Sequence, residues 1–315
     1  MSYKKALVIG IDAYPRNPLK GCVNDARDFA ELMRFNEDGS PNCEVDFRPD
    51  VPTKAALAAL VKDFFTGDSM TAVLYFSGHG FVNELGGTIV TPDARAFDEG
   101  LSMNMILQLA NASACRNKII ILDCCHSGAF GEPHLAGGIS THIGEGLTVL
   151  TASKKDQAAM ESGGHGVFTN LLLGALRGGA ANCSGYITPG SVYAYIDQAL
   201  TEFEQRPVFK TNISRFSSLR EVNPRVPKEV LRKISLYFAA PDGVYLLDPS
   251  YEDTNTLALP GNVAIFKDLQ KLQSIGLVEP VNTPFMFYAA MEGKGCRLTA
   301  PGQHYWRLAK KGRVY

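Results

Sequence analysis

Two apolar segments of this sequence each end in residues that can do chemistry. The run TAVLYFSG is followed by His79, and the run IIILDCCHSG contains Asp123, Cys124 and Cys125. A histidine beside a cysteine can remove the thiol proton, and the resulting thiolate is a strong nucleophile. If the two runs are neighbouring strands, the sequence predicts nucleophilic cysteine chemistry at one edge of a sheet.

Simpler interpretations of these residues stay open. A histidine after a strand is often an ordinary loop residue, and a cysteine in an apolar strand is often an inert small hydrophobe. Strand alternation places Cys124 opposite Asp123 and Cys125, so Cys124 fits the inert role. His126 and the two cysteines are candidate zinc ligands, but adjacent residues do not readily converge on one ion, and no C-x-x-C pair is present.

The elements that must position these residues alternate along the chain. Apolar runs at 5–11, 71–78 and 146–153 predict buried strands, and the spacing at 23–35 and 53–65 predicts helices. Strands that are apolar throughout, alternating with amphipathic helices, predict an α/β fold with a mostly parallel sheet covered on both faces. In such folds the ligand crevice lies at the carboxyl ends of the strands.

Composition sets the broad class. The 315 residues are 45% hydrophobic and 20% charged with net charge −1, as in an ordinary soluble protein of two domains. No apolar run approaches the ~20 residues of a membrane span, and the start lacks a secretory cleavage site, so we expect a cytoplasmic protein without membrane contact. Seven scattered cysteines do not indicate a disulfide framework.

The chain carries several motifs, which include ALVIGIDAY, LKGCVNDA, YFSGHG, IVTPDA, ILDCCHSG and QRPVFKT. Together they resemble one family, the caspase-fold cysteine peptidases of the metacaspase and bacterial orthocaspase branch. The resemblance covers about the first 215 residues. It implies a caspase-hemoglobinase-type three-layer sandwich over residues 1–222, with a large-subunit-like part to about 145 and a small-subunit-like part over 146–222.

The resemblance also assigns roles at the site. Cys125 becomes the nucleophile and His79, 46 positions earlier, the general base. The backbone N–H groups of Gly80 and Cys125 would form the oxyanion hole. The family generally works with this dyad, so no third acid is assigned.

The same resemblance also assigns the residues of the S1 pocket. Asp123 and Asp25 of the GCxND motif would line it, with Cys22 and Ser77 also in contact. Paired acids favour a cationic P1 side chain, Arg or Lys, because an unpaired buried charge is costly. Caspases that select Asp carry RG where this sequence has HSG. Asp25 has a second interpretation, as an acid favoured by the dipole at a helix N-terminus.

Calcium is the one cofactor that the resemblance raises, because many metacaspases bind it through a cluster of acids. The candidates Asp93, Asp98, Glu99 and Glu132 are scattered through the matching loops. No dense group of oxygen ligands is visible. We therefore expect no cofactor, with calcium dependence as the alternative.

The segment 226–315 lies outside the resemblance. FKDLQKLQSIGLVEPV followed by CRLTAPGQHYWRLAKKG is similar to a winged helix: a helix, a wing hairpin and a Leu-Thr-x-x-Gly turn into a last helix. The segment has 11 basic and 8 acidic residues, a small excess for nucleic-acid binding. We expect contact with an activating protein partner rather than DNA. Basic residues from Arg220 to Arg232 are expected in an interdomain linker.

Three functions follow from these observations. The first is a cytoplasmic cysteine endopeptidase that cleaves proteins after Arg or Lys, in a bacterial stress, cell-death or defence response. The second is a DNA- or protein-binding regulator whose winged helix acts and whose caspase-like part is a sensor. The third is an inactive scaffold, which the presence of both dyad residues disfavours.

Overall fold

The computed structural model describes residues 4–83, 86–96, 98–124, 143–152, 166–200 and 206–314. The chain divides into two compact units. Unit 1 comprises Met1–Asn182 and Tyr186–Val222, and unit 2 comprises Cys183–Gly185 and Asn223–Tyr315. No helix among the described residues combines the length and apolar character that crossing a membrane requires.

Unit 1 is built on a six-stranded sheet with the order β10-β8-β7-β3-β1-β2. All neighbouring pairs are parallel except β10 with β8. The mostly parallel sheet predicted from the apolar runs is thereby confirmed. The strands are β1 (Lys4–Gly10), β2 (Glu44–Pro49), β3 (Thr71–Gly78), β7 (Asn117–Cys124), β8 (Leu147–Thr151) and β10 (Val208–Asn212).

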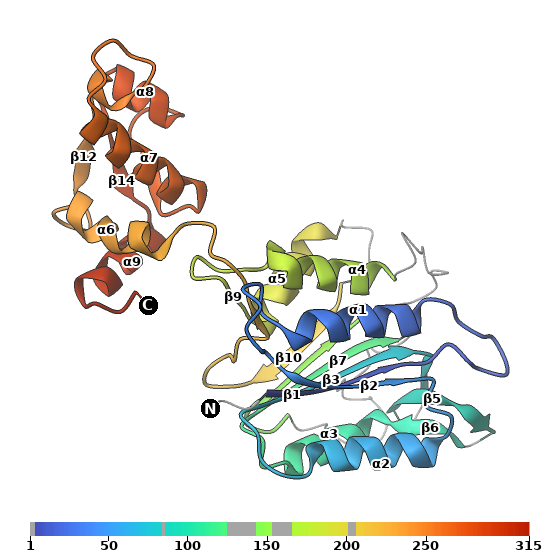
Figure 1. Cartoon of the computed structure of the whole chain (residues 1–315). Coiled ribbons are helices and arrows are strands. Elements are labelled where there is room, and N and C mark those ends of the chain that lie inside the picture. Colours follow the sequence, from blue (N-terminus) through green and yellow to red (C-terminus); the bar gives the residue numbers. More distant parts are fainter. Residues whose placement is uncertain are drawn as a thin grey trace. The chain divides into compact units, whose positions relative to one another are not determined.

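Helices cover both faces of this sheet (Figure 1). One face carries α1 (Cys22–Arg34), α4 (Val167–Gly174) and α5 (Pro189–Ala199), and the other carries α2 (Lys54–Phe65) and α3 (Met103–Ala112). Local sequence sets where several of them begin: Thr53, Ser102 and Thr188 accept backbone N–H groups at the starts of α2, α3 and α5. A short π-helical stretch, Ala175–Gly179, continues α4.

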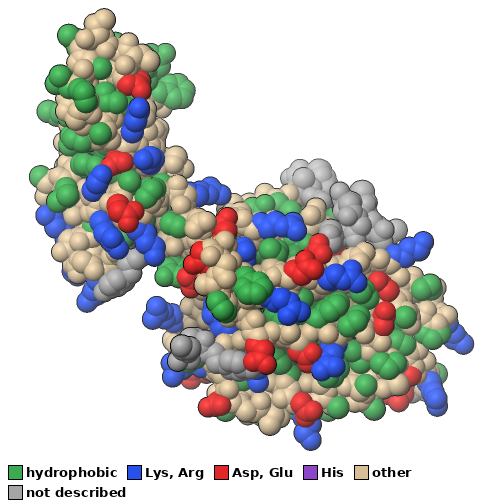
Figure 2. Space-filling view, viewed as in Figure 1, with side chains coloured by type: hydrophobic (Ala, Val, Ile, Leu, Met, Phe, Trp, Pro, Cys, Tyr) green, Lys and Arg blue, Asp and Glu red, His purple; other side chains and the backbone are tan. Residues whose placement is uncertain are grey.

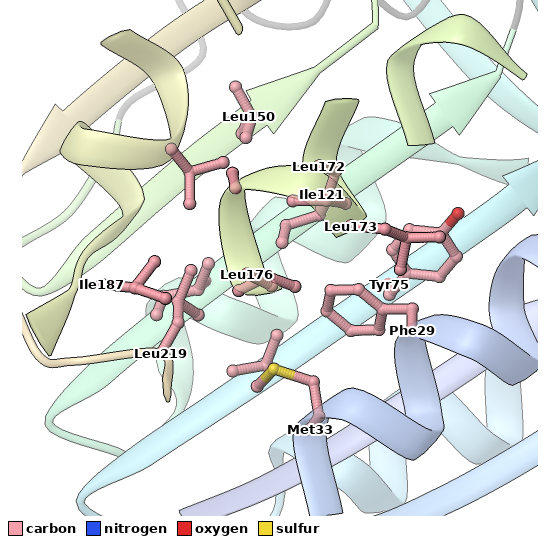
Figure 3. Close-up of a cluster of buried hydrophobic side chains, with 14 of the residues drawn as sticks. Phe29, Met33, Tyr75, Ile121, Leu150, Leu172, Leu173, Leu176, Ile187 and Leu219 are labelled. Atoms are coloured by element: carbon pink, nitrogen blue, oxygen red, sulfur yellow. The ribbon is translucent and has the colours of Figure 1, made fainter. Parts of the chain in front are cut away.

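One face of α1 is buried against the sheet. Ala26, Phe29, Ala30 and Met33 are all buried there. Phe29 of α1 stacks on Tyr75 of β3 with ring centroids 4.5 Å apart, and Figure 3 shows these two rings beside the leucines of α4. This contact fixes α1 on the sheet and places its first turn near the carboxyl end of β3.

The sequence analysis missed an antiparallel meander that follows β3. It consists of β4 (Gly80–Asn83), β5 (Gly86–Arg95) and β6 (Asp98–Ser102) in the order β4-β5-β6. These strands mix glycine, polar and apolar residues, and in β5 burial alternates instead of forming a continuous apolar run. Two further short strands, β9 (Tyr186–Ile187) and β11 (Arg220–Glu221), form a separate antiparallel pair.

Unit 2 has its own hydrophobic core and a three-stranded antiparallel sheet with the order β12-β14-β13. Thr299 caps the last helix by accepting the Gly302 N–H, as the Leu-Thr-x-x-Gly motif predicts. β13 and β14 pair, but α8 lies between them in the chain, where a simple wing would have only a turn. The elements are α6 (Lys228–Tyr237), β12 (Val244–Leu246), a 3₁₀ turn (Pro249–Tyr251), α7 (Pro260–Ser274), β13 (Val278–Pro280), α8 (Met286–Met291), β14 (Gly295–Leu298) and α9 (Ala300–Lys310).

The expected basic linker is shorter than the sequence suggests. Arg220 is buried in unit 1, where its guanidinium donates to the carbonyls of Phe35 and Leu176 at 2.9 and 2.8 Å. Arg232 lies inside helix α6, and its Nε donates to the Val314 carbonyl. Placing these two arginines in a linker was wrong, because both complete the hydrogen bonding of packed segments.

Candidate active site

The two predicted reactive segments lie on neighbouring strands. β3 and β7 are parallel, and their last paired positions are Ser77 with Asp123 and Gly78 with Cys124. His79 directly follows this end of β3. Cys125, the next residue after β7, lies outside the described residues. Gly78, the residue before His79, is therefore paired with Cys124, the residue before Cys125.

His79 is held by the loop that follows β1. Its Nε2 lies 2.7 Å from the carbonyl oxygen of Asn17. A carbonyl oxygen only accepts, so Nε2 carries the hydrogen and Nδ1 keeps a lone pair that can take a proton. The His79 backbone N–H donates to the Tyr14 hydroxyl at 3.0 Å, and the two rings lie 4.5 Å apart. Backbone and ring are thus both oriented by one loop.

The backbone N–H of Gly80 is not used in pairing with strand β5. Val90 N–H donates to the His79 carbonyl at 2.9 Å, and Gly80 lies opposite Ile89 in the β4–β5 pair. Paired positions of an antiparallel ladder alternate between hydrogen-bonded and non-hydrogen-bonded. Gly80 occupies a non-hydrogen-bonded position, so its N–H points away from β5.

Two buried carboxylates converge beside this edge of the sheet. Asp25 on α1 and Asp123 on β7 are 3% and 5% exposed. A Cβ placed on Gly166 would lie 3.4 Å from Asp123 Oδ2 and 3.7 Å from Asp25 Oδ2. The acids come from different elements and meet around one small stretch of backbone. Asp25 also lies in the first turn of α1, so its interpretation as a helix N-terminal acid fits its position as well.

Hydroxyl groups extend this acidic cluster into the core. Thr169 of α4 donates its hydroxyl to Asp123 Oδ2 at 2.7 Å and lies 2.7 Å from the Tyr75 hydroxyl. Both Thr169 and Tyr75 are fully buried. Burial raises the pKa of the Tyr75 phenol, and the nearby carboxylates raise it further. The phenol therefore stays neutral.

Cys22 lies in the same cluster, and its own thiol is unreactive. Burial raises its pKa to about 12, against a lowering by its hydrogen bond with Ser77. The carboxylates of Asp12, Asp123 and Asp25 also act to raise this pKa. Asp12 additionally accepts the Cys22 N–H at 2.9 Å at the start of α1. The predicted S1 residues Cys22, Ser77, Asp25 and Asp123 therefore lie close together.

Cys124 lies on the other face of the sheet. It is 1% exposed and packs in the hydrophobic cluster under α2 and α3, whereas Asp123 faces α4. The prediction from strand alternation is confirmed for this residue. Among the described residues, no group of three or more His, Cys, Asp or Glu side chains is arranged to hold a metal ion.

Two of the calcium candidates have structural partners. Asp93 accepts the Thr91 hydroxyl at 2.7 Å and the Lys54 N–H at 3.0 Å, and the Thr91 bond is the main cause of its lowered pKa. Asp98 pairs with the Lys54 ammonium. These acids hold the start of α2 against the meander. Glu99 lies in β6 beside Asp98, and Glu132 lies outside the described residues.

Four residues of this edge were missed by the sequence analysis: Tyr14, Asn17, Gly166 and Thr169. Tyr14 belongs to the quoted motif ALVIGIDAY, but nothing in its spacing indicates a contact with a histidine 65 positions later. Thr169 is one of two polar residues, with Asn170, in the otherwise apolar helix α4. A buried hydroxyl of that kind is a weak signal, because threonine also bonds to its own helix backbone.

A histidine held at the end of one parallel strand, beside a strand that leads into a cysteine, fits an α/β cysteine hydrolase. The sequence profile of the caspase domain, a peptidase family, matches residues 3–217. The chain therefore belongs to the caspase domain family. Membership implies cysteine peptidase activity on protein substrates.

Comparison with solved structures agrees with this fold through one of them, an insect caspase. The crystal structure of caspase-1 from Spodoptera frugiperda is 11% identical over 70% of this chain and 91% of that chain, with a TM-score of 0.51. A structure of pro-sf-caspase-1 is 12% identical over 70% and 94%, with a TM-score of 0.47. No match was found among curated protein sequences. The chain has a caspase-like α/β fold with a mostly parallel central sheet.

Proposed function

We propose that this chain is a cysteine endopeptidase that cleaves proteins after Arg or Lys through His79 and Cys125. His79 Nδ1 takes the Cys125 thiol proton, and the thiolate attacks the scissile carbonyl carbon. The N–H groups of Gly80 and Cys125 donate to the oxyanion that forms. The imidazolium then returns the proton to the leaving amine, and water hydrolyses the thioester.

The convergence of Asp25 and Asp123 carries the proposed specificity. Two buried carboxylates beside Gly166 provide negative charge and directional acceptors for a guanidinium or ammonium group. An aspartate at P1 would bring a third negative charge into the same buried cluster. The carboxylates lie on the sheet face that strand alternation assigns to Cys125, so a P1 side chain bound there accompanies a scissile bond at the thiol.

A panel of fluorogenic peptides that differ only at P1 tests this proposal. The wild-type enzyme should cleave after Arg or Lys with a kcat/KM at least about a hundred times that for Asp, because each lost contact to a buried charge is worth a few kcal/mol. Preferred cleavage after Asp would overturn the basic specificity. Absence of any Cys125-dependent cleavage would overturn the proposed activity.

Further assignments rest on the sequence resemblance and belong to the same proposal. They are the metacaspase or orthocaspase branch, a cytoplasmic location, and a bacterial stress, cell-death or defence role. We further propose that the enzyme needs no cofactor; two of the four calcium candidates, Asp93 and Asp98, are engaged with Thr91 and Lys54. Calcium chelation should therefore leave its activity unchanged.

We also propose that unit 2 is a winged-helix-like docking module for an activating protein. Large apolar side chains are exposed on several of its elements, including Leu236 at 78%, Leu246 at 73% and Phe285 at 61%. Figure 2 shows hydrophobic side chains gathered toward the end of this unit that carries α8, and Lys and Arg toward α6 and α9. Tight, salt-dependent binding of the full chain to duplex DNA would instead favour the regulator hypothesis.

A further inference from the structure

The Tyr14 hydroxyl takes the place of one backbone hydrogen bond between strands β4 and β5. At the start of the β4–β5 pair, Val90 N–H donates directly to the His79 carbonyl at 2.9 Å. The reciprocal bond, from His79 N–H to the Val90 carbonyl, is replaced by a bridge. His79 N–H donates to the Tyr14 hydroxyl at 3.0 Å, and that hydroxyl donates to the Val90 carbonyl at 3.3 Å.

The neighbouring backbone is shaped for this bridge. A Cβ on Gly78 would lie 2.6 Å from the Tyr14 hydroxyl oxygen, so only glycine lets the phenol reach the peptide between residues 78 and 79. Tyr14 itself is 5% exposed. Burial raises the pKa of its phenol far above neutrality. The hydroxyl therefore remains a donor and an acceptor at every pH at which the enzyme would work.

The loop that carries Tyr14 is fixed in turn. Asp50 Oδ1 accepts the N–H groups of Asp12 and Ala13 at 2.8 and 2.9 Å, immediately before Tyr14. Three residues after Tyr14, the Asn17 carbonyl lies 2.7 Å from His79 Nε2. The loop therefore holds His79 at its backbone N–H, through a tilted ring contact and at one ring nitrogen. Three contacts of this kind leave the imidazole one orientation and one tautomer.

We infer that Tyr14 is a positioning residue for His79, acting through the hydroxyl bridge on its backbone and through ring contact on its imidazole. This inference rests on the proposed role of His79 as the general base. The bridge sets the tilt of the 78–79 peptide, and with it the direction of Nδ1. The ring contact limits how far the imidazole can rotate.

Two substitutions separate these effects. Tyr14→Phe keeps the ring and removes the bridge, so kcat should fall about tenfold while KM for a P1-Arg peptide stays within about twofold. Tyr14→Leu also removes the ring contact with the imidazole, so kcat should fall further than in Tyr14→Phe. Tyr193→Phe is the control: its ring stacks on Phe209 at 5.1 Å, away from this site, and its kcat should not change.

A readout without turnover keeps the inference distinct from the proposed activity. In the Cys125→Ala protein with labelled histidine, nitrogen NMR should show His79 as the Nε2–H tautomer, and Tyr14→Leu should give a mixture of tautomers. Unchanged kcat in Tyr14→Phe, or a loss confined to KM, would overturn the positioning role and leave the peptidase proposal standing. If the wild type cleaves no peptide, the NMR experiment alone tests the inference. An unchanged His79 tautomer in Tyr14→Leu would then overturn it.

Discussion

The two faces of strands β3 and β7 carry different kinds of side chain. Toward α1 and α4, alternate positions place Tyr75, Ser77 and Asp123 among hydrogen-bonding partners. Toward α2 and α3, the intervening positions place Phe76 and Cys124 in a mainly apolar cluster. Both faces of these strands are buried, so the two faces differ in polarity and not in the amount of burial. The polar face is the one where chemistry is expected, and the apolar face holds the sheet together.

The largest expected effect separates the two adjacent cysteines. Cys125→Ala should abolish peptide hydrolysis, because it removes the nucleophile. Cys124→Ala should keep most of the activity and lower the free energy of unfolding by about 1 kcal/mol, from the loss of one buried sulfur. Activity assays and denaturant melts on both variants measure this difference. Loss of activity only in Cys124→Ala would mean that the faces are assigned the wrong way round.

The next effect concerns the acids of the polar face. Asp123→Ala and Asp25→Ala should each reduce kcat/KM for a P1-Arg peptide tens- to hundreds-fold, because a charge-assisted contact to a buried cation is worth about 2–4 kcal/mol. Asp63→Ala, on the exposed face of α2, is the matched control and should change nothing. Full activity in both pocket variants would show that P1 binds elsewhere.

A smaller effect is expected one step away from the pocket. Thr169→Val removes the hydroxyl that donates to Asp123 Oδ2 at 2.7 Å. The carboxylate keeps its charge but loses one fixed partner, so kcat/KM for a P1-Arg peptide should fall about three- to tenfold. Kinetics and a thermal melt measured together separate this loss from partial unfolding. An increase in activity would contradict the orienting role of the threonine.

The smallest expected effect concerns Cys22, whose thiol should not react with an alkylating reagent. Burial raises its pKa to about 12, so near pH 8 only about one molecule in ten thousand carries the thiolate. Iodoacetamide at that pH should leave Cys22 unmodified in the native protein, and mass spectrometry of the peptides reads this out directly. Rapid modification of Cys22 would show that the pocket is wetter and less crowded than the structure indicates.

Much of this comparison could be predicted from the sequence. The continuous apolar runs gave the buried strands, and the two-residue period of a strand placed Cys124 opposite Asp123. The apolar spacing at 23–35 and 53–65 gave helices α1 and α2, since one face of each helix must pack against the sheet. These signals are local, so they can be read before the fold is known.

What the sequence did not predict depends on contacts between distant segments. The meander β4–β6 has too few apolar residues to stand out, and its strands exist because each pairs with the next. The bridge from Tyr14 to His79 joins residues 65 positions apart, through a gap that only Gly78 leaves open. Arg220 looked like a linker residue because a buried arginine is recognisable only from the carbonyls that surround it.

Covalent capture tests the central claim most directly, since it reports the nucleophile and the pocket together. A peptidyl acyloxymethyl ketone with Arg at P1 should alkylate the enzyme as the thiolate displaces the carboxylate. A peptide map of the product should then place the adduct on Cys125. The matching reagent with Asp at P1 should react far more slowly, and Asp123→Ala should slow the Arg reagent. An adduct on Cys124, or faster labelling by the Asp reagent, would contradict the account.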